Sequence, residues 1–146
     1  QLTGIDYLKR IQSHLVLADF SNLRKLVLLK SWWDTVDLLS KNIGAIVEKE
    51  PSLIDEILKW SQEENIWIRR VSILHQLGLK DKTNTKLLRQ VILNNLHDDE
   101  FFIQKAIGWS LREYAKTDEK WVRNFTQEFE EELSTLSYRE AMKNLT

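Results

Sequence analysis

Two tryptophans and two carboxylates lie close together in the stretch Ser31-Trp32-Trp33-Asp34-Thr35-Val36-Asp37. Ser31 is suited to cap a helix that begins with this stretch. Trp33 and Asp37 are four residues apart, so both lie on one face of that helix. An aromatic face attracts a cation, and a carboxylate adds Coulomb attraction that grows as water is excluded. The pair could therefore receive a flat, positively charged group. The alternative is that the tryptophans belong to the core and Asp37 to a solvated face.

A second cluster, in the segment 101–115, suits an anionic partner. Lys105, Trp109 and Arg112 fall at positions i, i+4 and i+7, which is one face of a helix. A tryptophan between two cations is typical of a groove wall that meets a flat, anionic polymer. Gly108 lies inside the same helix and costs about 1 kcal/mol relative to alanine. Either a ligand that approaches closely or a tight contact between helices explains that cost.

The composition favours a helical protein. The 146 residues suffice for one domain with a substantial core. Four glycines and one proline are too few for the many turns of a β fold. The lack of cysteine excludes disulfides, thiolate-bound zinc and thiol catalysis. The three histidines lack metal-ligand spacing, and no apolar run is as long as a membrane span. We therefore expect an all-α protein without metal or cofactor.

Charge is unevenly distributed along the chain, although the net charge is only −1. Residues 65–116 contain nine basic and five acidic side chains, a local net charge of +4. Residues 117–132 contain six acidic and two basic side chains, a local net charge of −4. Only local charge can steer a polyanion. The first segment is thus a candidate nucleic-acid surface, and the second a solvated acidic face.

Capping residues and apolar spacing predict a series of short helices. They are expected over 5–16, after Asp19 or Ser21, from the Trp-Trp stretch, after Pro51, over 66–77 with a stop at Gly78, around 87–96, over 101–115, after Asp118, and from a last cap at Ser137.

A weak internal repeat organises these helices. The segments 67–71 and 102–106 match in residue type at an offset of 35, and Trp33 lies 34 residues before Trp67. This period predicts a HEAT/armadillo-like α-solenoid of antiparallel helix pairs with a concave basic face. Trp33, Arg70 and Lys105 would then lie near one wall. A non-repetitive helical bundle is the alternative.

Four motifs together resemble the signature of the AlkD-type DNA alkylation repair glycosylases. They are the Trp-Trp stretch 31–37, Asn65-Ile66-Trp67-Ile68-Arg69-Arg70, Glu100 through Trp109, and Leu136-Ser137-Tyr138-Arg139-Glu140-Ala141. They occur in the family's order and at nearly its spacings. Family members are longer, with helices before the region that begins here. The resemblance therefore implies that residues 1–146 form a single HEAT-like α-solenoid domain from the C-terminal part of a longer DNA alkylation repair protein.

The resemblance also implies an activity. Members hold duplex DNA and excise cationic alkylpurines, such as 3-methyladenine and 7-methylguanine, by hydrolysing the N-glycosidic bond. By motif position, Trp33, Asp37, Arg70 and Trp109 match the family's active-site residues. Asp37 would stabilise the developing oxocarbenium ion and position water, and Arg70 would clamp a phosphate. The resemblance further implies a monomeric protein of the bacterial cytoplasm that binds neither a metal ion nor a membrane.

Arg69, Lys105 and Arg112 are the candidate contacts to the DNA backbone. No Schiff-base lysine is indicated, so we predict a monofunctional glycosylase that leaves an abasic site. Two rivals remain: a helical-repeat scaffold for a protein partner, and a non-catalytic module that binds damaged or branched DNA. A scaffold has no need of a carboxylate beside an exposed tryptophan. Substitution of Asp37 would separate an enzyme from a sensor, because only the enzyme has activity to lose.

Overall fold

The computed structural model describes residues 18–145, in which every regular element is a helix. A helix over residues 18–29 is followed by α2 (Trp33–Lys49), α3 (Ile54–Trp60), α4 (Ile66–Leu74), α5 (Thr85–Leu93), α6 (Phe101–Ala115), α7 (Glu119–Glu128) and α8 (Thr135–Ala141). Short 3-10 turns, Pro51–Leu53 and Lys80–Lys82, precede α3 and α5. The all-α prediction is confirmed, while the helix expected over 5–16 lies outside the described residues.

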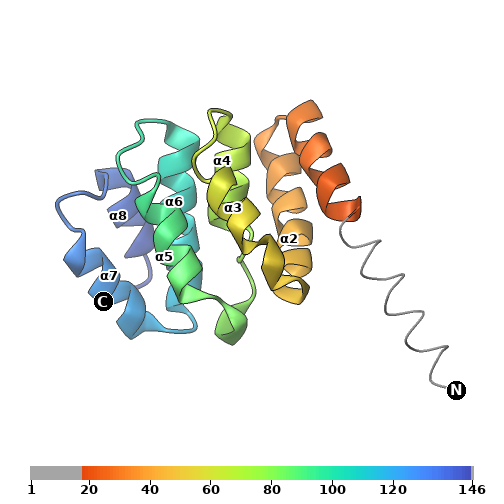
Figure 1. Cartoon of the computed structure of the whole chain (residues 1–146). Helices are drawn as coiled ribbons and strands as arrows, with labels where there is room; N and C mark the ends of the chain where they lie inside the picture. Colours follow the sequence, from red (N-terminus) through yellow and green to blue (C-terminus); the bar gives the residue numbers. More distant parts are fainter. Residues whose placement is uncertain (1–17, 146) are drawn as a thin grey trace, which may run out of the picture.

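The helices form two layers (Figure 1). α2, α4, α6 and α8 lie side by side in a row, because each packs against the next. We call them the even row. α3 packs against α4 and α5, and α7 packs against α6, so these helices cover the other side. Helix pairs therefore stack in chain order, as in an α-solenoid. The predicted site segments on α2, α4 and α6 thereby become neighbours.

Two apolar clusters fill the space between the layers. The first joins residues of the helix over 18–29 with α2, α3, α4 and α5, and Trp60 is its largest fully buried side chain. The second joins α4, α5, α6, α7 and α8. Because α4 and α5 contribute to both clusters, the two halves of the row are held as one body.

Side chains cap two of the expected helices. Asn65 Oδ1 accepts hydrogen bonds from the backbone N–H groups of Trp67 and Ile68 at the start of α4. Asp118 Oδ1 accepts from the N–H of Trp121 at the start of α7. These bonds satisfy donors that have no partner inside the helix.

Two other predicted caps are wrong. Ser31 Oγ donates to two carbonyls of the preceding helix and so ends that helix. Trp32 occupies the N-cap position of α2 without a side-chain bond. Ser134 caps α8, since its Oγ accepts from the N–H of Ser137. α8 therefore begins earlier than expected, and Ser137 lies within it.

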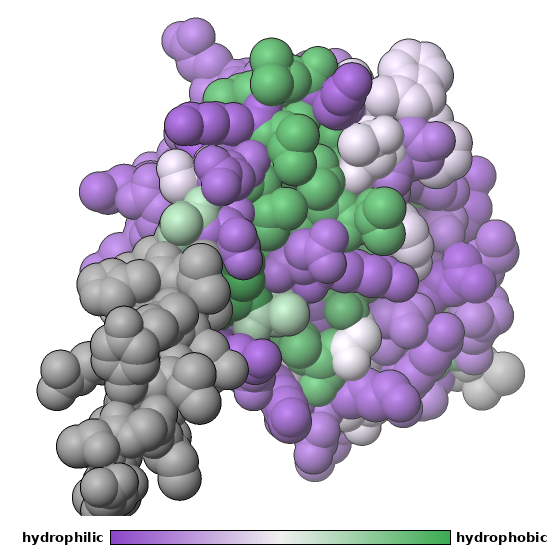
Figure 2. All heavy atoms as spheres, turned by 90° about the vertical axis from the view of Figure 1, so that its right-hand side faces the viewer, coloured by the Kyte–Doolittle hydropathy of each residue, from purple (hydrophilic) through white to green (hydrophobic). Residues whose placement is uncertain are grey.

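The end of the solenoid at the helix over 18–29 exposes apolar side chains. Figure 2 shows hydrophobic atoms gathered on this face. Of the exposed large apolar side chains among the described residues, all but Phe101 belong to the segment 26–38. Contiguous exposed apolar surface is typical of an interface. Within residues 18–145, this end therefore has the composition of a contact surface and not that of the polar outer face of a solenoid cap.

Gly44 lets α2 and α4 approach each other closely. A Cβ atom at this position would lie 1.7 Å from the carbonyl oxygen of His75. A backbone oxygen cannot move aside as a flexible side chain can. Gly44 therefore sets the distance between α2 and α4, and with it the position of Asp37 relative to α4.

His75 lies fully buried at the end of α4. Its Nδ1 is 2.8 Å from the carbonyl oxygen of Ser72, and its Nε2 has no hydrogen-bond partner in the described structure. Burial lowers the pKa of His75 from 6.5 to about 4, although hydrogen bonds to the backbone at Ser72 and Val71 act in the opposite direction. The folded protein therefore holds this imidazole neutral where an unfolded chain would protonate it.

We expect Gly44→Ala to destabilise the protein. Replacing glycine by alanine inside a helix normally adds about 1 kcal/mol of stability. Here the added methyl group meets the backbone of His75, so we expect a loss of about 3 kcal/mol in the free energy of unfolding. Urea unfolding measures it. Ala45→Gly, at the exposed neighbouring position, should cost only about 1 kcal/mol. A Gly44→Ala protein as stable as the wild type would contradict the close approach.

We expect part of the stability to be lost in mild acid because of His75. Its pKa is lower in the folded state than in the unfolded state, so the unfolded state binds the proton first and stability falls as the pH drops below about 6.5. The free energy of unfolding should be about 2 kcal/mol lower near pH 5 than near pH 7.5. Urea unfolding of His75→Gln should lack this part of the pH dependence, whereas His97→Gln, at an exposed position, should keep it.

Candidate functional site

An ion pair between α2 and α4 lies at the centre of the predicted catalytic residues. Arg70 Nε donates to Asp37 Oδ1 at 2.8 Å, and Arg70 Nη2 donates to Asp37 Oδ2 at 3.0 Å. Two parallel charge-assisted bonds fix the carboxylate in position and orientation. Arg70 Nη1 donates to the backbone carbonyl of Phe102 at 2.5 Å. A single guanidinium thus joins α2, α4 and α6.

The two partners lie at different depths. The side chain of Arg70 is 4% exposed and that of Asp37 is 14% exposed. The carboxylate is therefore nearer the surface, and the guanidinium lies beneath it. The nitrogens of Arg70 bond within the protein, and the residue is buried. Arg70 thereby holds Asp37, and the expected contact of Arg70 with a DNA phosphate stays a prediction.

The Trp-Trp pair does not belong to the core. Trp32 is 63% exposed and Trp33 is 46% exposed. Trp33 is the first residue of α2 and stands one turn before Asp37 on the same face. Trp109, on α6, is partly buried and packs against the second apolar cluster. An exposed indole therefore stands one turn before the held carboxylate on α2, and Trp109 lies further along the even row.

Lys105 and Arg112 both bind a residue that the sequence analysis had not proposed for the site. Lys105 Nζ donates to Glu140 Oε2 at 3.1 Å, and Arg112 Nη1 donates to Glu140 Oε1 at 3.0 Å. Burial raises the pKa of the Glu140 carboxyl, but hydrogen bonds from Lys105 and Arg112, together with the charges of Lys105 and Lys143, outweigh burial and hold the pKa below its usual value. The signal that could have found this contact is the separation of Lys105 and Glu140, which equals the repeat offset of 35.

Gly108 allows this contact. A Cβ atom on Gly108 would lie 2.6 Å from the Cβ of Glu140 and 2.9 Å from the carbonyl oxygen of Ser137. Ser137 Oγ also donates to the carbonyl of Gln104 at 2.7 Å. Of the two explanations for a glycine here, a tight contact between helices is therefore correct, and that contact is between α6 and α8.

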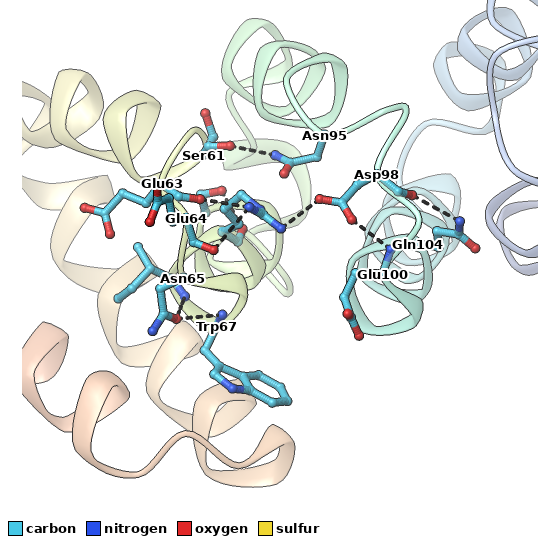
Figure 3. A network of polar contacts seen from close by, with 12 residues as sticks. Ser61, Glu63, Glu64, Asn65, Trp67, Asn95, Asp98, Glu100 and Gln104 are labelled. Carbon is cyan, nitrogen blue, oxygen red and sulfur yellow. Dashed lines mark hydrogen bonds and ion pairs between the residues drawn. The ribbon is translucent and has the colours of Figure 1, made fainter.

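Arg69 binds groups in the loops before α4 and α6, and Figure 3 shows two of these partners, Glu63 and Asp98. Its Nη2 donates to Asp98 Oδ2 at 2.7 Å, and its Nη1 donates to the carbonyl of Glu63 at 2.9 Å. Asp98 Oδ1 also accepts from the N–H of Glu100 at the start of α6. The side chain of Arg69 is only 17% exposed. Arg69 therefore joins the loop before α4 to the loop before α6, and its expected contact with DNA stays a prediction.

The basic segment is largely neutralised by pairing. Most of its cations form ion pairs with acidic side chains, namely Arg69, Arg70, Arg89, Lys105, Arg112 and Lys116. A local charge of +4 in the sequence therefore does not translate into a surface of free cations. Among the described residues, no group of three or more acidic or histidine side chains could hold a metal ion, and none of the helices is long and apolar enough to cross a membrane.

Comparison with known proteins settles the family. A family model described as "DNA alkylation repair enzyme" matches residues 1–145. The chain belongs to this family. A solved structure described as a predicted DNA alkylation repair enzyme from Enterococcus faecalis is 41% identical, with a TM-score of 0.80. The match covers 89% of this chain and 61% of that chain, so the present chain spans less than two thirds of that relative's length. No curated protein matches significantly.

We expect Arg70→Lys to be strongly destabilising. Lysine has the same charge but cannot make the bidentate pair and the third bond to the Phe102 carbonyl together. The loss in the free energy of unfolding should be about 3 kcal/mol. Arg112→Lys is the matched control, because Arg112 is 30% exposed and makes one bond to Glu140; it should cost less than about 1 kcal/mol. Equal losses in the two variants would show that the buried pair does not hold the row together.

Proposed function

We propose that the protein is a monofunctional DNA glycosylase that hydrolyses the N-glycosidic bond of cationic alkylpurines, such as 3-methyladenine and 7-methylguanine, in duplex DNA. The observation that carries the proposal is the Asp37 carboxylate, which buried Arg70 holds near the surface, one turn from exposed Trp33. Membership of the DNA alkylation repair family supports it. Such an enzyme would act as a monomer in the bacterial cytoplasm, and it would need neither metal nor cofactor.

The proposed chemistry needs little acid catalysis. Alkylation at N3 or N7 places a positive charge on the purine and weakens its bond to C1′ of the sugar. When that bond breaks, its electron pair leaves with the base, which departs neutral, and C1′ acquires oxocarbenium character. A water oxygen then bonds to C1′ and loses a proton. Asp37 would stabilise the developing cation and accept this proton, and an abasic site would remain.

The ion pair with Arg70 reduces the field of Asp37 without cancelling it. A carboxylate about 4 Å from a unit positive charge contributes roughly 4 kcal/mol at an effective dielectric constant of about 20. A guanidinium behind it, at about 8 Å, opposes this by roughly 2 kcal/mol. The remaining 2 kcal/mol or so corresponds to a rate factor of about 30. Because Arg70 is the deeper partner, the negative end of the pair is directed outward.

The even row would supply the DNA-binding surface. Trp33 and Trp109 would lie against the lesion nucleotide and contribute cation–π contact. Lys105 and Arg112 are 39% and 30% exposed and would meet backbone phosphates. We propose that these side chains line a concave basic face of the solenoid.

Release of free base from a duplex that contains a single 7-methylguanine tests the activity. We expect Asp37→Asn to lower the single-turnover rate by about 100-fold or more, because both the field and the proton acceptor are lost. Asp34→Asn is the matched control, since Asp34 is exposed on the same helix and bonds only to the N–H of Thr35; its rate should stay within about twofold. Binding of the duplex without release of base by the wild type would replace the enzyme with a damage sensor.

A further inference from the structure

We propose that Glu140 competes with DNA phosphate for Lys105 and Arg112, and thereby restrains the affinity of the protein for duplex DNA. The inference rests on the proposed function, in that it takes DNA as the ligand of the even row. It adds a residue and a role that catalysis does not require. Glu140 would act on every DNA sequence alike, because the phosphate backbone is the group for which it substitutes.

The geometry of the cluster is that of an occupied anion site. Each carboxylate oxygen of Glu140 accepts a hydrogen bond from a different cation of α6, at 3.1 Å from Lys105 and 3.0 Å from Arg112. The side chain of Glu140 is only 12% exposed, and its Cβ is seated against Gly108. Lys143 adds a further favourable charge. The carboxylate therefore occupies the position between the two cations where a bridging phosphate would otherwise bind.

The two cations keep the capacity to bind an external anion. Lys105 uses one of its donors on Glu140, and Arg112 uses only Nη1. An ammonium has three N–H groups and a guanidinium has five, so donors remain. Both side chains are also more exposed than the carboxylate between them. A phosphate can therefore approach from solvent. The carboxylate of Glu140, however, lowers the combined charge of Lys105 and Arg112 by one unit.

The size of the effect follows from counterion release. Each phosphate neutralised by a cation contributes about 0.9 to the slope of the logarithm of affinity against the logarithm of salt concentration. Freeing one positive charge should therefore tighten binding about five- to tenfold at roughly 100 mM salt and steepen the slope by about one. Such restraint favours release of undamaged DNA, since sequence-independent binding is mainly electrostatic.

Glu140→Gln tests the proposal, because it removes the charge and keeps the packing against Gly108. The probe is an undamaged duplex of about 20 base pairs, with binding followed by fluorescence anisotropy between roughly 50 and 300 mM NaCl. Glu128→Gln is the matched control. Glu128 lies on α7, outside the even row, and pairs with Arg89. Its substitution changes the net charge of the protein by the same amount. We expect five- to tenfold tighter binding for Glu140→Gln and less than twofold change for Glu128→Gln.

A second pair of proteins tests whether Glu140 acts through the two cations. In a Lys105→Gln, Arg112→Gln background, Glu140→Gln should change affinity by less than about twofold. An equal gain in both backgrounds would overturn the proposal in favour of a general repulsion between Glu140 and DNA. Unchanged or weaker binding by Glu140→Gln, in a protein whose thermal unfolding temperature matches the wild type, would also overturn it.

The outcome is separable from that of the proposed enzyme activity, because the probe is undamaged and no base is released. If Glu140→Gln binds DNA more tightly as expected but the wild type releases no 7-methylguanine, the glycosylase proposal is contradicted and the proposed role of Glu140 is supported. Base release by the wild type with no gain from Glu140→Gln would do the reverse. If no variant bound duplex DNA, both proposals would fail.

Discussion

The buried guanidinium of Arg70 is the constraint on which the candidate site depends. A charge taken out of water is costly unless its donors are satisfied, and here they are satisfied by Asp37 on α2 and a carbonyl of α6. The three helices must therefore keep their register for Arg70 to remain paired. The requirement that stabilises the row also fixes the direction of the Asp37 carboxylate. Gly44 makes this possible, because it lets α2 and α4 approach closely.

Ion pairs between successive repeats recur along the row. Asp37 and Arg70 join α2 to α4, Arg69 and Asp98 join the loops before α4 and α6, and Glu140 joins α8 to α6. Each contact joins residues about one repeat apart in the chain, as expected where each repeat touches only its neighbours. Internal ion pairs therefore neutralise part of the positive charge of a basic segment in such a solenoid. The positive charge left for an external anion depends on which acidic side chains lie opposite the cations.

The row of helices and its order could be predicted from the sequence, because the spacing of Trp33, Trp67 and Phe102 encodes the period. Asp37 and Arg70 could be singled out by motif, but not their pairing. The internal partners of Arg69 and Arg70 could not be predicted, since adjacent residues differ by about 100° around a helix and the partner of each lies on another repeat. The contacts of Glu140 could not be predicted, because helix-start patterns are local whereas its partners lie 28 and 35 residues away.

The central claim concerns the proposed activity: Arg70 would serve catalysis only through Asp37. The most direct measurement is a double-mutant cycle on the single-turnover rate of 7-methylguanine release, with Asp37→Asn, Arg70→Lys and the two combined, under conditions in which all four proteins are folded. If Arg70 acts by holding the carboxylate, Arg70→Lys will lower the single-turnover rate when Asp37 is present. The same substitution will have almost no further effect on the rate of the Asp37→Asn protein. If the two losses multiply, Arg70 makes its own contact with DNA, and the claim is wrong.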